Sequence, residues 1–560
     1  MSNGHSDIVK FSLINNNAHN IFSLPVELLQ IIFVVILTDT FWESREFPPP
    51  LGINIPKIRT ELQLVCKLWQ SSILSCSHLW VYVDLEFLSS AAVWRTLELS
   101  GSAPLWLNSL RRTSRGAGKG PVAQEARLVA ELLKSEGHRI AVLMLDEPVF
   151  AAVSKRPQAN WTVLPCEATA LQYLDLNIPE ENALASHPPW PLLLSRAPNL
   201  TRCKLSGMSH QPFWGTLSTA PITRLRCLEL ERAVFSAMAD FARLAKQLPN
   251  LERIILDNVT FTENTSDAAA SLENLDDIQL PRLKHLGIEY CDSIVFCLIG
   301  KLVLLPQARI VLEFIHVDAD DTDLVLRAIP RIAAGISPNS MYDLSLLLSE
   351  GRLELYGYKN RGIQFANIYD LHLEPDLVLR LSWTGSSVGP HPTAVHFVRG
   401  IYERLPLEHT RVLTLELPSG PGAIHRDICA LRAVFARLVH VEAIYVDNST
   451  DPVCMASLAT LLHIDDGKPV PLPQLTALWF SKSGQWSWCP ECATTFVHDL
   501  CKVLRMRAAA GRPIARVLSE SFCGLNVPEA VEAAVRALVS EFSEKIRVPG
   551  LPRMATHKCF

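Results

Sequence analysis

The sequence lacks the features that send a chain across a membrane, out of the cell or onto nucleic acid. Its first residues contain no basic segment followed by an apolar core, so a secretory signal is not expected. The longest apolar run, residues 31–37, is far shorter than the ~20 residues that span a bilayer. Lys and Arg number 52 against 57 Asp and Glu, so the basic excess of a nucleic-acid-binding protein is missing. We expect a cytoplasmic or nuclear protein with neither nucleic-acid nor membrane partners.

A disulfide framework and a complete metal site are also lacking. The 14 cysteines are scattered, and several lie inside apolar runs such as "LRCLEL", where a free thiol behaves as a small hydrophobe. One C-x-x-C pair, Cys489 and Cys492, is followed by His498 and Cys501, which could complete a zinc site of four ligands. Thiols without metal are the simpler interpretation. We therefore predict no metal and no cofactor.

Catalytic motifs are weak or incomplete. Residues 385–389 match G-x-S-x-G, in which Ser387 would be the nucleophile of a serine hydrolase. That motif needs a helix directly after the serine, whereas Pro390 and Pro392 follow here. We predict a glycine-serine loop at this position, no catalytic residue and no enzyme activity.

The N-terminal region predicts a helix that is apolar on every side. Pro25 suits a first helical position, and Glu27 suits the first turn. Helical spacing groups five side chains into one stripe: Leu28, Leu29, Ile32, Phe33 and Ile36. Four further apolar residues lie on other faces: Ile31, Val34, Val35 and Leu37. A helix of this kind must be covered on more than one side.

A second helix is expected over residues 60–75, after a proline-containing loop at 38–58. One of its faces carries apolar side chains at helical spacing: Leu62, Val65, Cys66, Trp69 and Ile73. The alternating segment "LWVYVDL", residues 79–85, then predicts a strand.

The segments "LPVELLQIIF", "LVCKLW" and "HLWVYVDL" occur in that order and resemble an F-box with a long loop between its first two helices. The resemblance covers residues 21–87. It implies docking on the Skp adaptor of cullin-RING ubiquitin ligases. It assigns adaptor contacts to Leu24, Pro25, Leu28, Leu29, Ile32, Val65, Cys66, Lys67 and Trp69, while Phe33 and Trp80 could serve the adaptor or the module's own core.

Burial supports a partner independently, because a ~60-residue unit hides only about 60% of the surface that its unfolded chain exposes. The alternative is that the rest of the chain covers both helices. In that case the protein would be a repeat scaffold without any ligase association.

Downstream, one short phrase recurs. "APNLTRCKL" (197–205), "LPNLERIIL" (248–256), "LPRLKHLGI" (280–288) and "LPQLTALWF" (472–480) share a proline and an L-x-x-φ-x-φ core. Four segments repeat the core without the proline: 171–177, 225–231, 412–418 and 441–448. Starts at Leu171, Leu200, Leu225, Leu251 and Leu283 step by 29, 25, 26 and 32 residues. This period predicts a leucine-rich-repeat-like solenoid of alternating strands and helices.

The predicted fold class is therefore α/β, a small all-helical F-box followed by a repeat solenoid with parallel strands. Residues 1–20 are expected to be a disordered tail, 88–160 a transitional segment with an exposed loop at 111–121, and 161–525 the solenoid. Residues 526–560 would form a capping helix, centred on 527–542, and a tail. Register is unassigned between about 300 and 410.

Together these expectations predict a substrate-recognition subunit of a Skp–cullin–F-box ubiquitin ligase. The F-box would bind the adaptor and, through it, the cullin-RING ligase, and the repeats would hold a target protein whose identity the sequence does not give.

Overall fold

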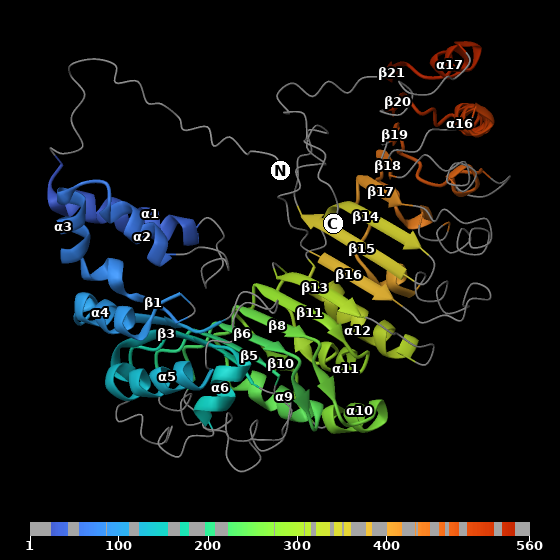
Figure 1. Cartoon of the computed structure of the whole chain (residues 1–560). Coiled ribbons are helices and arrows are strands. Elements are labelled where there is room, and N and C mark those ends of the chain that lie inside the picture. Colours follow the sequence, from blue (N-terminus) through green and yellow to red (C-terminus); the bar gives the residue numbers. More distant parts are fainter. Residues whose placement is uncertain are drawn as a thin grey trace, which may run out of the picture. The chain divides into compact units, whose positions relative to one another are not determined.

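The structure is a computed structural model with two compact units, residues 1–199 and 200–560, which are described one at a time (Figure 1). It describes residues 24–42, 55–85, 87–110, 122–154, 168–178, 197–207, 222–273, 275–306, 308–314, 321–336, 341–349, 352–359, 377–382, 400–416, 432, 435–447, 458–464, 470–480, 490–519 and 529–543. The predicted tail at 1–20 and loop at 111–121 lie outside these ranges.

Three helices open the first unit: α1 (Val26–Trp42), α2 (Ile55–Gln63) and α3 (Lys67–Ser75). The single helix predicted at 60–75 is therefore wrong, because the chain turns between α2 and α3. Cys66 is extended there, with φ −162° and ψ 168°, and its Sγ accepts a hydrogen bond from the Trp69 amide at 3.5 Å. A side chain that satisfies a free amide in this way starts a new helix.

A parallel sheet begins directly after these helices and a short 3-10 turn at Ser77–Trp80. Strands β1 (Tyr82–Asp84), β2 (Leu105–Asn108), β3 (Ile140–Leu145) and β4 (Tyr173–Asn177) pair in that order. Helices α4 (Ser90–Ser100), α5 (Val122–Glu136) and α6 (Glu147–Ser154) connect them. The described residues 88–110 and 122–154 thus form strand–helix units, where the sequence predicted a transitional segment over 88–160.

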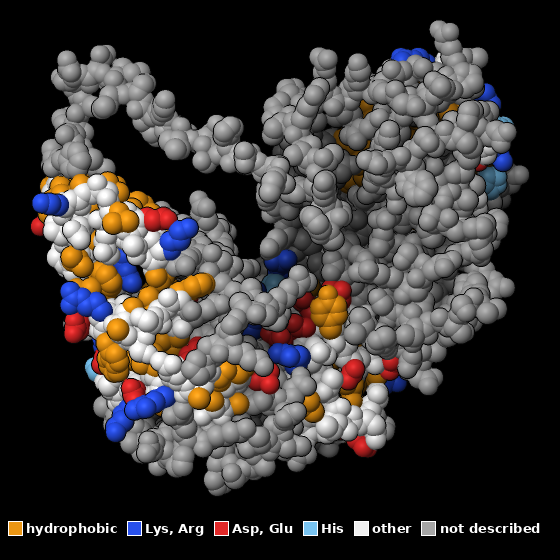
Figure 2. Space-filling view, in the orientation of Figure 1, with side chains coloured by type: hydrophobic (Ala, Val, Ile, Leu, Met, Phe, Trp, Pro, Cys, Tyr) orange, Lys and Arg blue, Asp and Glu red, His pale blue; other side chains and the backbone are white. Residues whose placement is uncertain are grey.

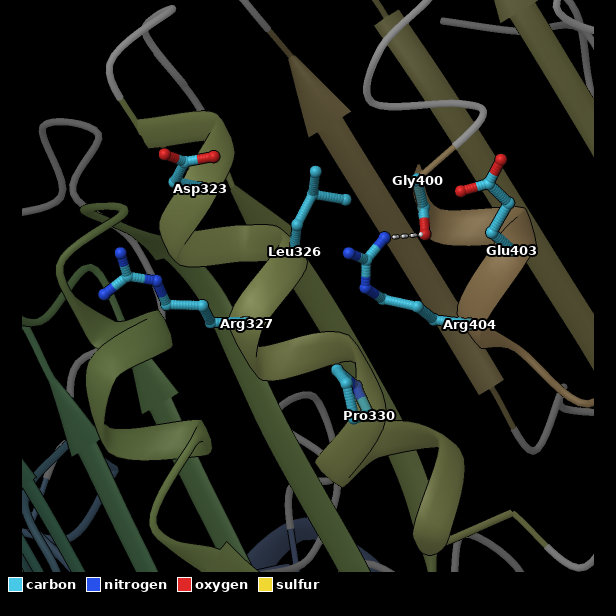
Figure 3. A pocket seen from close by; sticks show the side chains of 7 residues that line it. All are labelled: Asp323, Leu326, Arg327, Pro330, Gly400, Glu403 and Arg404. Carbon is cyan, nitrogen blue, oxygen red and sulfur yellow. Dashed lines mark hydrogen bonds between the residues drawn. The ribbon is translucent and has the colours of Figure 1, made fainter.

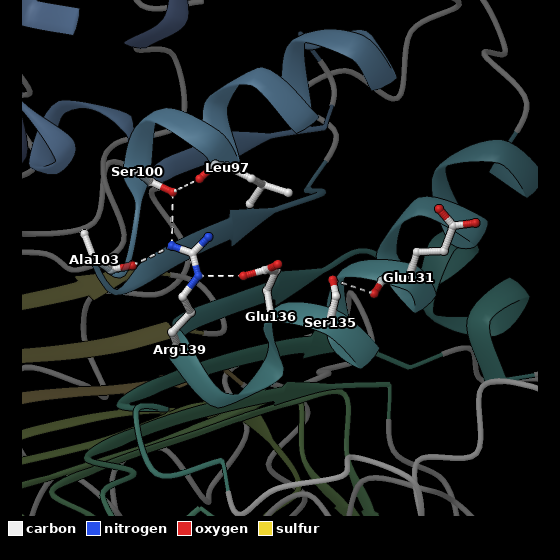
Figure 4. Close-up of polar contacts among 7 residues, drawn as sticks. All are labelled: Leu97, Ser100, Ala103, Glu131, Ser135, Glu136 and Arg139. Carbon is white, nitrogen blue, oxygen red and sulfur yellow. Dashed lines mark hydrogen bonds and ion pairs between the residues drawn. The ribbon is translucent and has the colours of Figure 1, made fainter. Parts of the chain in front are cut away.

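Arg139 links two neighbouring strand–helix repeats within the first compact unit (Figure 4). Its side chain is 9% exposed, and its Nε lies 2.6 Å from Glu136 Oε2. The guanidinium also donates to Ser100 Oγ at 3.0 Å and to the Ala103 carbonyl at 2.9 Å. A buried charge is tolerated when its donors are satisfied in this way.

Replacing Arg139 by methionine should therefore lower the free energy of unfolding by about 2–3 kcal/mol, because Glu136 and the Ala103 carbonyl lose their partner. Chemical unfolding measures the change. Arg127→Met is the matched control, because Arg127 is 72% exposed beside Glu131, and it should cost less than about 0.5 kcal/mol. Equal losses in the two variants would contradict the role given to Arg139.

In the second unit, five parallel strands pair in the following order: β5 (Arg202–Ser206), β6 (Cys227–Glu231), β8 (Arg253–Asp257), β11 (His285–Cys291) and β13 (Arg309–Phe314). The register shifts once, between Glu289 and Cys291 of β11. Figure 1 shows α9 (Met238–Lys246), α10 (Thr265–Glu273), α11 (Val295–Ile299) and α12 (Thr322–Ala334) along one side of them. Short strand pairs β7–β9 (Val234–Phe235 with Thr260–Phe261) and β10–β12 (Ile278–Gln279 with Leu302–Val303) lie between strands and helices.

The recurring phrase predicted its strands correctly, since each of the eight segments contains one. The leucine that opens the core of the phrase is buried, as at Leu200, Leu225 and Leu251, which are 0–2% exposed. Its amide closes a turn onto the carbonyl three residues earlier, as from Leu251 to Leu248 at 3.1 Å. The turn brings the chain into the next strand, so the phrase sets the register of the ladder.

The irregular region is an antiparallel insertion, which corrects the expectation of parallel strands throughout. Strands β14 (Met341–Ser349) and β15 (Arg352–Lys359) pair antiparallel, as do β15 and β16 (Leu377–Ser382). β16 pairs parallel with β13, and β14 pairs parallel with the later β17 (Val412–Glu416). The parallel ladder therefore resumes on the far side of these strands.

After β17 the sheet continues through β18 (Ala443–Asp447), β19 (Ala477–Phe480), β20 (Arg516–Ser519) and β21 (Glu541–Ser543), all parallel. Helix α16 (Pro490–Ala509) lies between β19 and β20 in the sequence. The capping helix predicted at 527–542 is wrong in its second half: α17 spans only Glu529–Arg536, and Phe542 pairs with Val517 in the sheet. Val535 of α17 is buried.

Candidate protein-binding surfaces

Helix α1 buries one of its faces and exposes another. Leu29, Phe33 and Leu37 are 0–5% exposed and form the inner row, at the i, i+4, i+8 spacing of a helix. Gln30 Nε2 donates to the Ser72 carbonyl at 3.2 Å and to Ser75 Oγ at 3.0 Å, which fixes α1 against α3. The stripe that the sequence predicted is therefore split, with Leu29 and Phe33 inside and Leu28, Ile32 and Ile36 outside.

Aromatic side chains fill the core beneath α1. The rings of Phe33 and Trp69 meet edge to face, with centroids 4.8 Å apart. Trp80 Nε1 donates to the Ile73 carbonyl at 2.8 Å, and the Arg59 guanidinium carbon lies 3.9 Å above the Trp80 ring. Arg59 also donates to the Leu79 carbonyl, and burial lowers its pKa to about 10. The three helices and the 3-10 turn thus share one small core.

Apolar side chains remain on the outside of the same helices. We call the following set the exposed apolar face; its side chains are 37–78% exposed: Val26, Leu28, Ile31, Ile32, Val35, Ile36, Leu64, Val65 and Leu74. Figure 2 shows hydrophobic side chains gathered over the part of the surface where Figure 1 draws α1 to α3. Concentrations of exposed apolar side chains mark surfaces that bind other molecules.

The predicted adaptor contacts divide between the two environments. Five of them are exposed: Pro25, Leu28, Ile32, Val65 and Lys67. Leu24, Cys66 and Trp69 are half-buried, and Trp69 Nε1 has no hydrogen-bond partner within the described ranges. Leu29, Phe33 and Trp80 are 0–7% exposed core residues, so they have little or no surface to offer a partner.

Six residues of the exposed apolar face were not among the predicted contacts: Val26, Ile31, Val35, Ile36, Leu64 and Leu74. The signal for them was present, because a helix that is apolar all round must leave some apolar side chains outside a small core. Sequence periodicity alone could not say which side of that helix faces inward.

Part of the possible zinc site and the whole G-x-S-x-G segment of the possible hydrolase site lie outside the part of the chain that the structure describes. Ser387 and Cys489 lie outside the described residues, and the Cys492 side chain is not described. His498 is exposed on α16, whereas Cys501 is 5% exposed, so the two side chains face different surroundings. Among the residues that the structure describes, no group of three His, Cys, Asp or Glu side chains could hold a metal ion.

A second candidate surface is the outer sheet face, formed by the side chains of β5, β6, β8, β11 and β13 that alternate with buried leucines and isoleucines. The register aligns these side chains in rows across the strands. The basic row contains Arg202, Cys227, Arg253, His285 and Arg309. The acidic row, four residues further along each strand, contains Ser206, Glu231, Asp257, Glu289 and Glu313. Of these ten side chains only Ser206 and Glu313 are buried.

Burial and neighbouring charges shift the pKa values of several ionisable groups on this face. Burial, with Arg253 and Arg309 on either side, lowers the pKa of His285 to about 4. Burial and then Glu229 raise the pKa of the Cys227 thiol to about 12. Burial, with Glu231 and Glu313 nearby, raises the pKa of Asp257. At neutral pH the basic row therefore carries three positive charges with neutral side chains between them.

His285 should make the fold sensitive to mild acid. An unfolded histidine takes up a proton near pH 6.5, whereas folded His285 does so only near pH 4. Stability is therefore unaffected by this group above pH 6.5 and falls as the pH is lowered from 6.5 towards 4. His285→Gln should flatten that slope in urea unfolding. An unchanged slope in His285→Gln would contradict the prediction.

A cavity of about 640 Å³ lies between α12 and the helical residues 400–404 (Figure 3). Two basic and two acidic side chains line it, Arg327, Arg404, Asp323 and Glu403. Arg404 donates to the Gly400 carbonyl at 2.9 Å, and a Cβ at Gly400 would come within 2.5 Å of Leu326. The glycine thus allows the close approach of the two helices, and the mixed charges single out no ligand class.

Neither a scan of known protein families nor a search of curated proteins found a match for this chain. Within the described ranges, no helix combines the length and the hydropathy needed to cross a bilayer.

Proposed function

We propose that the chain is a substrate-recognition subunit of a Skp–cullin–F-box ubiquitin ligase, working in the cytoplasm or the nucleus. The observation that carries the proposal is the exposed apolar face of the helical module. Leu28, Ile32 and Val65, three positions where the F-box resemblance expects adaptor contacts, are 46%, 38% and 55% exposed. Exposing such side chains to water is unfavourable, by about 25 cal/mol per Å², and an adaptor that covers them would recover that free energy.

In this proposal the chain performs no bond chemistry itself. The helical module attaches it to a Skp-type adaptor and so to a cullin-RING ligase, while the repeats hold the target. Tethering can raise the local concentration of a target lysine to the mM range. Holding the target in a productive orientation accelerates transfer further. No cofactor or metal is required of this chain.

The second candidate is a repeat scaffold with no ligase association, in which the N-terminal helices cap the sheet. One observation favours it, because β1 follows these helices and pairs directly with β2. A cap, however, needs a polar outer face to keep a repeat protein soluble. Side chains such as Ile31, 58% exposed, and Leu64, 78% exposed, argue against that role.

Affinity purification of the tagged full chain tests the proposal. We expect a Skp-type adaptor and a cullin among the recovered proteins. The matched comparison is Val65→Asp against Val439→Asp, because both valines are exposed but only Val65 belongs to the exposed apolar face. Adaptor and cullin should be lost from the first sample and kept in the second. Recovery of neither protein with the unaltered chain would favour the scaffold.

A further inference from the structure

We propose that the basic row of the outer sheet face binds an acidic segment of a protein target, which lies across strands β5 to β13 in an extended conformation. This inference rests on the proposed function for the presence of a target and adds its chemical class. The row consists of Arg202, Arg253 and Arg309, with Cys227 and His285 between them.

The spacing of the arginines suits an extended ligand. Adjacent strands of a sheet lie about 4.8 Å apart, so arginines on alternate strands stand about 9.6 Å apart. A polyproline II segment returns its side chains to one face every three residues, about 9.3 Å. A target with an acidic residue at every third position could therefore place one carboxylate at each of Arg202, Arg253 and Arg309.

The charges within the row reinforce one another. Cys227 and His285 separate the arginines but carry no charge at neutral pH, as described above. The fields of the arginines overlap because their spacing is close to the Debye length of about 8 Å in physiological salt. Glu229 lies 3.7 Å from Arg253 Nε and offsets part of that arginine's charge. Arginine suits this task since its planar fork can form two parallel hydrogen bonds to one carboxylate.

The acidic row restricts where on the face an acidic segment can bind. Glu231, Asp257, Glu289 and Glu313 lie four residues further along the strands, and they repel an acidic segment that strays from the basic row. Figure 2 shows red and blue side chains close together in the region where Figure 1 draws β8, β11 and β13. A basic segment held on the acidic row is the competing arrangement, and the experiment below separates the two.

Near the centre of the face, Gly287 is a buried position between the two rows. A Cβ at this position would come 3.4 Å from His285 Nε2 and 3.6 Å from Glu289 Oε1, which are ordinary contacts. The glycine is therefore not required by the packing of its neighbours. A large side chain here should obstruct a segment that crosses the strands, and it leaves the charge of the face unchanged.

The test measures binding of a fluorescent peptide of repeated Glu-Pro-Pro triplets to the full chain at low salt. We expect the triple variant Arg202→Ala/Arg253→Ala/Arg309→Ala to raise the Kd by about tenfold or more. The matched control is Arg95→Ala/Arg127→Ala/Arg243→Ala, which removes three helix-surface arginines with side chains 61–72% exposed. It should change the Kd by less than about twofold.

Further variants keep the test decisive if the first triple variant fails to fold. Arg202→Glu alters an exposed side chain alone, and Gly287→Leu changes shape without charge; each should weaken binding. Equal effects of the two triple variants on the Kd would overturn the inference. So would tighter binding of a Lys-Pro-Pro peptide than of the Glu-Pro-Pro peptide, if substitutions in the acidic row weaken that binding. Adaptor binding measured on the same variants should be unchanged. Its absence from the unaltered chain would count against the proposed function instead.

Discussion

Replacing Leu28 and Ile32 together by aspartate should weaken binding of a Skp-type adaptor by about a hundredfold or more. Both side chains project from the exposed apolar face, at 46% and 38% exposure, and neither fills the core beneath α1. Two carboxylates at the centre of an apolar interface would each be desolvated without a partner. The stability of the unbound chain should fall by less than about 1 kcal/mol, as is usual for surface substitutions.

The matched control is Trp94→Asp/Val439→Asp, which places two aspartates at apolar positions of similar exposure, 41% and 38%, that do not belong to α1, α2 or α3. It should leave adaptor affinity unchanged. Isothermal titration with the purified adaptor compares the two variants. Comparable losses in both, or none in the α1 variant, would mean that the exposed apolar face is not the docking surface.

The second large effect is on stability. Phe33→Ala should lower the free energy of opening of α1 and α3, as measured by hydrogen exchange, by about 3–5 kcal/mol. This is the usual cost of truncating a buried aromatic side chain to alanine. Phe33 is 0% exposed and meets the Trp69 ring edge to face. Hydrogen exchange of the full chain reports this region by itself, which matters because a chain of two units need not unfold in one step.

Ile31→Ala is the control on the same helix, two residues away and 58% exposed. It should change the protection of α1 by less than about 1 kcal/mol. A loss at Ile31 as large as that at Phe33 would show that the faces of α1 are assigned the wrong way round.

The strands were the part of the fold most accessible from sequence. A buried leucine, a turn closed on its amide and two further apolar positions recur together, and each recurrence is a strand, as at Leu225 and Leu251. Strands β2 and β3 were missed because "LWLN" and "IAVLML" lack that phrase, although β3 pairs with both β2 and β4 in the first unit. The antiparallel pair β14–β15 was missed for the same reason.

The helical module shows what periodicity could not provide. Apolar residues continue through Leu64 and Val65, so the pattern predicted one helix, whereas the Cys66 cap separates two. Around α1 the difficulty was rotation, since Leu28 and Leu29 are equally apolar. In the structure Leu29 is buried in the same row as Phe33, whose ring meets Trp69, whereas Leu28 is exposed.

The central claim, that the exposed apolar face docks an adaptor, is tested most directly by titrating the full chain with a purified Skp-type adaptor at several temperatures. The account predicts a one-to-one complex with a Kd of about 1 µM or tighter and a negative heat-capacity change from apolar burial. An absence of binding at about 50 µM, or binding without that heat-capacity change, would contradict it.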